Sequence, residues 1–145
     1  MKTKVDVLGL YYKIWVDAIV VEQSKRNRKT NWKLNTIIPM SVLNGANLLT
    51  FFYWMKTIVN KNFLLFFPVS IFNAKPLNGF ISIVITFFIP FVILNYLLIF
   101  NNDRYKELLI KYPGNNGKLY KKYILFSLGL LIVPVVIMKV YFAKV

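Results

Sequence analysis

The sequence predicts an all-α integral membrane protein in which an N-terminal amphipathic interfacial helix precedes three transmembrane helices. Three long stretches, 34–55, 76–102 and 123–138, contain no charged residue and are bounded by Lys, Arg or Asp. A helix needs about 20 residues to cross a hydrocarbon core of about 30 Å, and these stretches reach or approach that length. Hydrophobic residues make up 57% of the 145 positions, an apolar excess that one small soluble core could not bury.

The basic residues predict a multi-pass orientation in a bacterial inner membrane rather than binding to nucleic acid. The formal net charge is +14, and short loops rich in Lys and Arg remain in the cytoplasm, where anionic lipids attract them. We therefore expect 24–33 and 101–122 to be cytoplasmic and 56–76 to lie outside. The side chains expected to contact lipid or a partner are Lys25, Arg26, Arg28, Lys29, Lys33, Arg104, Lys121 and Lys122. An acidic protein partner, or RNA, is the alternative explanation of the charge.

The first segment, 4–23, is predicted to be an amphipathic helix on the membrane surface. Its apolar and aromatic residues recur at spacings of three and four, namely Val5, Leu8, Tyr12, Trp15 and Ile19. The charged residues Asp6, Lys13 and Asp17 share another face, and they exclude a cleavable secretory signal in this segment. The alternative is a four-helix transmembrane bundle, in which Lys13 and Asp17 form an intramembrane pair that offsets part of the cost of burying each charge.

The first transmembrane helix is predicted at 34–56. Pro39 lies in its opening turns, where a missing N–H is least harmful, and Tyr53 and Trp54 form an aromatic belt at the far end. The next apolar piece, 62–74, is too short to cross a membrane and is interrupted by Pro68. We therefore predict an interfacial or re-entrant segment there.

The second transmembrane helix is predicted at 77–100, kinked by Pro90 and extended as a helix to about residue 112. Consecutive turn formers follow at 113–117, where the chain should reverse. The third transmembrane helix is predicted at 119–141, with Lys side chains near both ends reaching towards the head groups. A single membrane domain therefore covers 1–145.

The residue types that usually carry catalysis are scarce, so we expect no enzyme, no cofactor and no metal site. Cys and His are absent, which removes thiolate ligands, the commonest metal ligand and the proton shuttle of neutral pH. The five acidic residues lie outside the long uncharged stretches, and no nucleophile elbow or phosphate-binding loop is present. Asp17 alone could carry a proton at membrane depth, although a surface charge paired with Lys13 is the simpler interpretation.

Small and polar residues predict a helix-packing seam between the first two transmembrane helices. Those in 34–56 fall on one side of the helix at 3.6 residues per turn, and those in 77–100 repeat a small-x-x-x-small spacing. Small residues allow close approach, and Asn amides form hydrogen bonds across such contacts. The seam residues are Ser41, Asn44, Gly45, Asn47, Ser82 and Thr86. Packing within one chain is the first interpretation, followed by packing against another subunit and by lining of a polar path.

Two functions from different classes fit these observations. The first is a non-catalytic subunit or scaffold of a larger membrane assembly, which contacts membrane lipids and another membrane protein or a second copy of itself. The second is a small oligomeric pore, exporter or holin-like protein, in which Asn44, Asn47 and Asn95 surround a water path. A membrane enzyme comes third, because it would need acids or nucleophiles that the chain barely has.

Overall fold

The computed structural model describes residues 7–25, 31–59, 62 and 64–142, and within these residues the chain forms helices and no strands. The three basic residues Arg26, Arg28 and Lys29, and the first positions of the predicted 4–23 helix, lie outside the described residues. The elements are α1 (Val7–Ser24), α2 (Trp32–Ile58), α3 (Lys75–Ile83), η1 (Val84–Phe88), α4 (Ile89–Asn95), η2 (Tyr96–Phe100), η3 (Asn101–Asp103), α5 (Arg104–Lys111) and α6 (Lys118–Phe142). The all-α prediction is therefore confirmed.

The elements from α3 to η2 form one long helix between Lys75 and Phe100, which we call the long helix. Pro90 lies in its interior and has no N–H to donate. The chain accommodates it by a π-helical turn, η1, where the amide of Ile89 donates to the carbonyl of Val84. Widened turns of this kind are a common response to a locally broken hydrogen-bond pattern.

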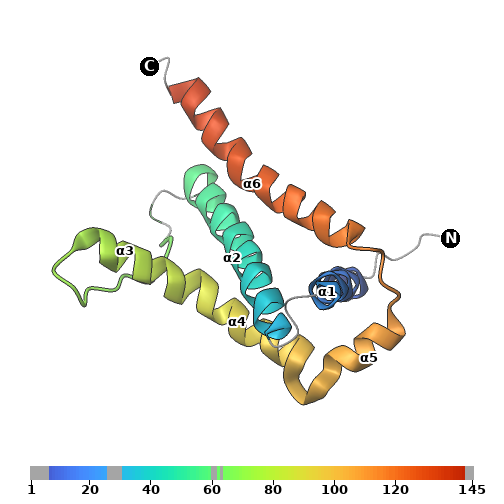
Figure 1. The fold of residues 1–145 in the computed structure, drawn as a ribbon. Helices are drawn as coiled ribbons and strands as arrows, with labels where there is room; N and C mark the ends of the chain where they lie inside the picture. The colour runs from blue at the N-terminus through green and yellow to red at the C-terminus, as the bar shows by residue number, and fades with distance from the viewer. Residues whose placement is uncertain (1–6, 26–30, 60–61, 63, 143–145) are drawn as a thin grey trace.

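The sequence pattern predicted that the second transmembrane helix extends to about residue 112. In the structure this helix is interrupted after Phe100. Asn102 and Asp103 have positive φ values of 51° and 56°, so the backbone leaves the right-handed helical region for two consecutive residues. Asn and Asp adopt this left-handed conformation more readily than most residues. As a result α5 turns sharply away from the long helix, as Figure 1 shows.

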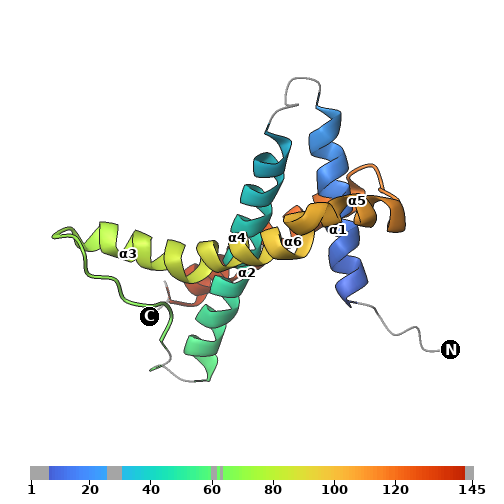
Figure 2. The same cartoon turned by 90° about the horizontal axis from the view of Figure 1, so that it is seen from below.

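α1 is the helix around which the core forms. It runs beside α2 in the opposite direction, while α2 crosses the long helix obliquely (Figures 1 and 2), and α1 also contacts α5 and α6. Trp15, Val16 and Ile19 have no exposed surface, and the Trp15 ring meets Phe100 edge-on with 5.9 Å between centroids. Leu8, which the sequence pattern assigned to the same apolar face, is 58% exposed.

The predicted interfacial or re-entrant piece at 62–74 contains no helix among its described residues. Residues 64–74 form an irregular extended chain that runs alongside α3 in both views (Figures 1 and 2). We call this chain the strap. Together with α3 it forms an arm that projects away from α1 and α5.

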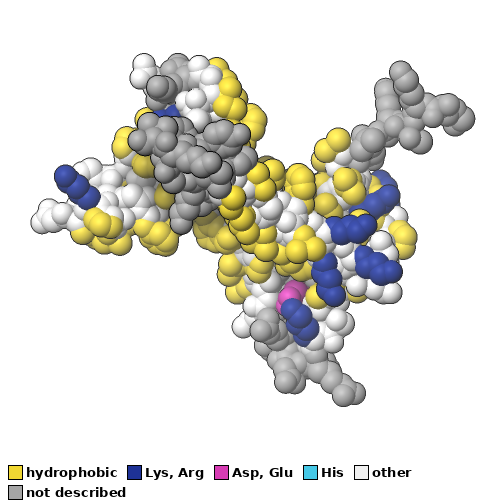
Figure 3. All heavy atoms as spheres, turned by 90° about the horizontal axis from the view of Figure 1, so that it is seen from above, with side chains coloured by type: hydrophobic (Ala, Val, Ile, Leu, Met, Phe, Trp, Pro, Cys, Tyr) yellow, Lys and Arg dark blue, Asp and Glu magenta, His cyan; other side chains and the backbone are white. Residues whose placement is uncertain are grey.

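Within the described residues, one helix is long and apolar enough to cross a membrane, the helical stretch Lys75–Lys111 that contains the long helix, with a mean hydropathy of 2.6 over its most apolar part. Many large apolar side chains elsewhere are also exposed, among them Val42, Phe51, Leu125 and Phe126 at 50% or more. Figure 3 shows hydrophobic side chains across the middle of one face, and most of the Lys and Arg visible in this view lie on one side of it. The surface therefore has the amphiphilic division that a membrane environment would favour.

Candidate functional site: a buried polar network

Four helices meet at a network of uncharged polar side chains. Its centre is Asn95 of α4, which has no exposed surface. The Asn95 amide group donates to the Ser41 hydroxyl at 2.9 Å, and its carbonyl oxygen accepts from the Tyr11 hydroxyl at 2.5 Å. Asn44 of α2 donates to the Tyr11 oxygen at 3.2 Å. The Asn95 amide is thus satisfied at both ends by side chains from α1 and α2, as buried polar groups require.

A second branch of the network joins α2 to α6. The Tyr123 hydroxyl donates to the Asn44 carbonyl oxygen. Asn47 donates to the Tyr123 oxygen at 3.1 Å and to the Ser127 hydroxyl at 2.9 Å. The Asn47 carbonyl oxygen is buried without a hydrogen-bond partner. It lies beside a groove of about 420 Å³ that is lined mainly by apolar side chains from α1, α2, α4 and α6.

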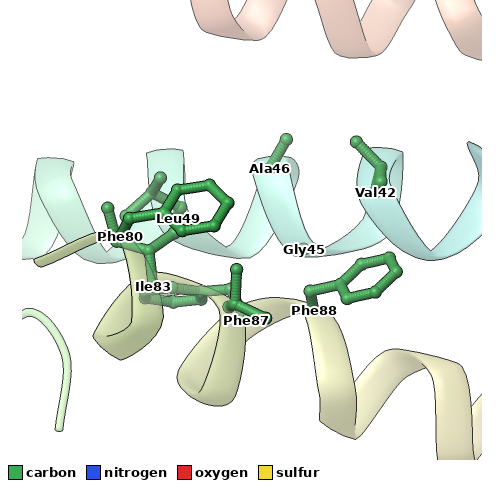
Figure 4. Close-up of a pocket in the computed structure, with 9 residues that line it drawn as sticks. Val42, Gly45, Ala46, Leu49, Phe80, Ile83, Phe87 and Phe88 are labelled. Atoms are coloured by element: carbon green, nitrogen blue, oxygen red, sulfur yellow. The ribbon is translucent and has the colours of Figure 1, made fainter. Parts of the chain in front are cut away.

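The close approach of α2 to the long helix depends on Gly45. A Cβ placed on Gly45 would lie 2.5 Å from the carbonyl oxygen of Phe87, a backbone atom that cannot move by itself. An apolar groove of about 370 Å³ opens beside this crossing, and Val42, Phe80 and Phe88 help to line it (Figure 4). Glycine is therefore required here by contact distance and not by backbone conformation.

The structure separates the predicted seam into three parts. Ser41, Asn44 and Asn47 belong to the polar network described above, and Gly45 lies at the helix crossing. Ser82 and Thr86, which were expected to face these residues, instead accept hydrogen bonds from the backbone of the strap. Their four-residue spacing along the helix matches the spacing of alternate backbone amides in the extended strap. The sequence pattern alone does not reveal this partner.

Asp17 joins α1 to the start of α6. Its carboxylate has no exposed surface and accepts hydrogen bonds from the backbone amides of Asn115 and, at 2.8 Å, Leu119. Leu119 is the second residue of α6, so Asp17 caps the helix N-terminus from a distant part of the chain. Asp17 therefore does not pair with Lys13, whose side chain is exposed. Neither the surface pair nor the intramembrane pair is present in the described residues.

The 113–117 loop, which carries the Asn115 amide, fits closely against α1. Gly117 has a φ of +76°, and a Cβ there would lie 2.6 Å from a methyl group of Val21. Only glycine meets both the conformation and the contact without adjustment. The predicted turn at 113–117 thus serves as the joint between α1 and α6.

The basic residues that the sequence assigned to lipid or partner contact are mostly exposed. Lys25 forms an ion pair with Glu22. Lys33 lies 3.5 Å from Asp103 and above the Tyr105 ring. Hydrogen bonding to Lys106 lowers the pKa of the Asp103 carboxyl. Arg104, Lys121 and Lys122 are also exposed, so the described members of the set remain available at the surface.

The network joins helices through uncharged hydrogen-bonding groups. Its members within the described part of the chain are amides, hydroxyls and phenols, without a carboxylate or an ammonium group. Among the described residues no group of three acidic, His or Cys side chains is placed to hold a metal ion. Sequence reasoning missed Tyr11, Tyr123 and Ser127 as members. Tyr side chains near helix ends are typical of the aromatic belts at membrane interfaces. The two tyrosines therefore did not by themselves indicate a buried network.

No family model, curated protein or solved structure matches this chain.

Proposed function

We propose that this protein is a non-catalytic membrane subunit or scaffold, inserted through α2, the long helix and α6. The observation that carries the proposal is the polar network of amides, hydroxyls and phenols, which joins four helices through side-chain hydrogen bonds. Polar contacts of this kind hold helices together where surrounding lipid provides little hydrophobic driving force. The exposed apolar surfaces are then the faces that meet lipid or a partner.

The charge distribution supports a defined orientation. Exposed Lys and Arg side chains occur around the start of α2, on α5 and at the start of α6. These three places lie near the same end of the molecule in Figure 1. With that end in the cytoplasm of a bacterial cell, the basic side chains would meet anionic lipid or an acidic partner surface.

α1 is proposed to stand against the cytoplasmic end of the bundle. Tyr11 reaches the network between α2 and α4, whereas Asp17 and Val21 contact the 113–117 loop. In this proposal α1 is part of the helix bundle and does not lie flat on the membrane surface. The C-terminal half of α1 contacts this loop and also packs into the core, where Val16 and Ile19 have no exposed surface.

The pore hypothesis receives less support from the geometry. Asn44 and Asn95 would have to face a water path, but their amide groups are engaged with Tyr11, Ser41 and Tyr123 inside one chain. A measurement of ion leakage from liposomes that contain the purified protein separates the two hypotheses. Leakage that disappears in Asn44→Leu, with the assembly intact, would contradict the scaffold proposal.

The orientation is tested with reporter fusions at Asn115 and Val145. Three crossings place Asn115 in the cytoplasm and the end of the chain outside, so the two fusions should give opposite signals. Copurification from native membranes after crosslinking then tests the subunit role. Equal cytoplasmic signals from both fusions would contradict the three-span topology.

A further inference from the structure

The strap is bound to the long helix by a regular set of side-chain acceptors. Asn78, Ser82 and Thr86 lie four residues apart along the long helix, and each accepts from a backbone amide of the strap. The bonds are Phe67 N to Thr86 Oγ1 at 3.0 Å, Val69 N to Ser82 Oγ at 2.9 Å, and Ile71 N and Phe72 N to Asn78 Oδ1 at 3.2 and 2.9 Å.

The spacing of this ladder follows from the geometry of the two chains. Four helical residues rise about 6 Å, and two residues of an extended chain span about 6.6 Å. Alternate strap amides at Phe67, Val69 and Ile71 therefore meet successive helix side chains. Pro68, between the first two, has no N–H that needs a partner. The helix side chains thus provide hydrogen-bond acceptors for strap amides, a role that a neighbouring strand has in a β-sheet.

The ladder carries the strap far along the long helix. Thr86 lies eleven residues after Lys75, which corresponds to about 17 Å along the helix axis. If the long helix spans a hydrocarbon core of about 30 Å, the bonded Phe67 amide lies near the middle of that core. The strap contains no charged residue, and its outward side chains Leu64, Phe67 and Ile71 are 63%, 65% and 72% exposed.

We propose that residues 64–74 form a re-entrant strap that lies at hydrocarbon depth, with its exposed apolar side chains against lipid acyl chains. Non-helical backbone survives in a membrane only where its polar groups are satisfied by protein. The side chains of Asn78, Ser82 and Thr86 provide hydrogen-bond acceptors for four strap amides, those of Phe67, Val69, Ile71 and Phe72. The inference rests on the proposed insertion of the long helix.

Depth-dependent quenching tests the strap directly, because the chain contains no Cys and single-Cys variants can be labelled cleanly. Phe67→Cys, Phe72→Cys and Ile85→Cys each carry an NBD fluorophore in liposomes whose phosphatidylcholine bears a nitroxide at a shallow or a deep acyl position. The label at residue 67 should be quenched more by the deep nitroxide, and the label at residue 72 more by the shallow one. Ile85 reports the depth of the long helix itself.

Thr86→Val removes the hydroxyl that binds the Phe67 amide while keeping the side-chain shape. It should move the residue 67 label towards the shallow quencher, whereas Thr57→Val, which alters a hydroxyl bonded within α2, should leave it in place. Circular dichroism establishes that each variant keeps its helix content. A shallow label at residue 67 with a deep label at residue 85 would overturn the strap proposal alone. Shallow labels at both positions would overturn the proposed function as well.

Discussion

The two ends of the long helix lie in very different surroundings. Its Phe100 end is enclosed by aromatic rings from α1, α2 and α5, including Trp15, Trp32 and Tyr105. Its Lys75 end is accompanied by the strap, and the nearby side chains of Leu77 and Phe80 are 43% and 64% exposed. Cohesion at the first end comes from packing and side-chain hydrogen bonds between helices. At the second end it comes from bonds between side chains and an extended backbone.

This difference indicates that stability is concentrated at the Phe100 end. Packed aromatic side chains and a polar network shared by four helices must break together, and such coupled contacts behave cooperatively. The arm has few buried apolar contacts, so the rest of the molecule should depend on it less. Variants placed in the two regions and at their junction can test that division.

The largest effect is expected at Gly45, where the two regions meet through the crossing of α2 and the long helix. Gly45→Leu should lower the free energy of unfolding by about 2 to 3 kcal/mol, because its side chain must displace the Phe87 backbone. Unfolding in mixed micelles, followed by circular dichroism, measures the change. Val42→Leu is the matched control, since Val42 is 50% exposed. Equal tolerance at both positions would show that the crossing is not a close contact.

Asp17→Asn should cause the next largest loss of stability. Asp17 belongs to the region around the Phe100 end of the long helix. The amide cannot accept both backbone N–H groups as a carboxylate does, and it loses the favourable charge at the start of α6. Hydrogen bonds to charged groups contribute about 1.5 to 3 kcal/mol, so a loss of about 2 kcal/mol is expected. Asp103→Asn, which changes an exposed carboxylate, should leave the unfolding midpoint unchanged. A similar response from both variants would contradict the capping role.

A smaller effect is expected when the network loses one hydroxyl. Tyr11→Phe removes the group that donates to Asn95 and accepts from Asn44, so the stability should fall by about 1 kcal/mol. Tyr96→Phe changes the same atoms on a side chain that is 53% exposed and should be nearly silent. The same unfolding measurement compares the pair. Equal unfolding midpoints for the two variants would show that the network does not contribute measurably to stability.

The smallest effect concerns the exposed surface beyond the enclosed end. Because Lys106 lowers the pKa of Asp103, the ion pair should contribute above the ordinary carboxyl pKa and lose its contribution as pH falls through the lowered value. The pair is fully exposed, so solvent and salt should keep its effect on stability slight. Titration of the Asp103 carboxyl by carbon NMR should show a higher pKa in Lys106→Gln. An unchanged titration would contradict the pairing.

Several helices were predictable because their signals are local. The predicted 34–56 helix corresponds to α2 at Trp32–Ile58, and the predicted 119–141 helix corresponds to α6 at Lys118–Phe142. Long uncharged runs and turn formers suffice for such predictions. The break at Asn102 and Asp103 was missed, since neither residue forbids a helix and the apolar pattern continues on both sides. The left-handed conformation of these two residues is visible only in the folded chain, where α5 turns away from the long helix.

Composition and local spacing were enough to predict the helical class, the exposed apolar residues and the scarcity of groups for acid–base chemistry. These properties depend on composition and on spacings within single segments. Which polar residues meet could be seen only in the folded chain, since Tyr11, Asn44, Asn95 and Tyr123 are far apart in sequence and converge where four helices cross. The folded chain also places Asp17 at the start of α6. Periodicity reports which side of a helix a residue occupies, but the partner depends on contacts between distant segments, which a local pattern does not contain.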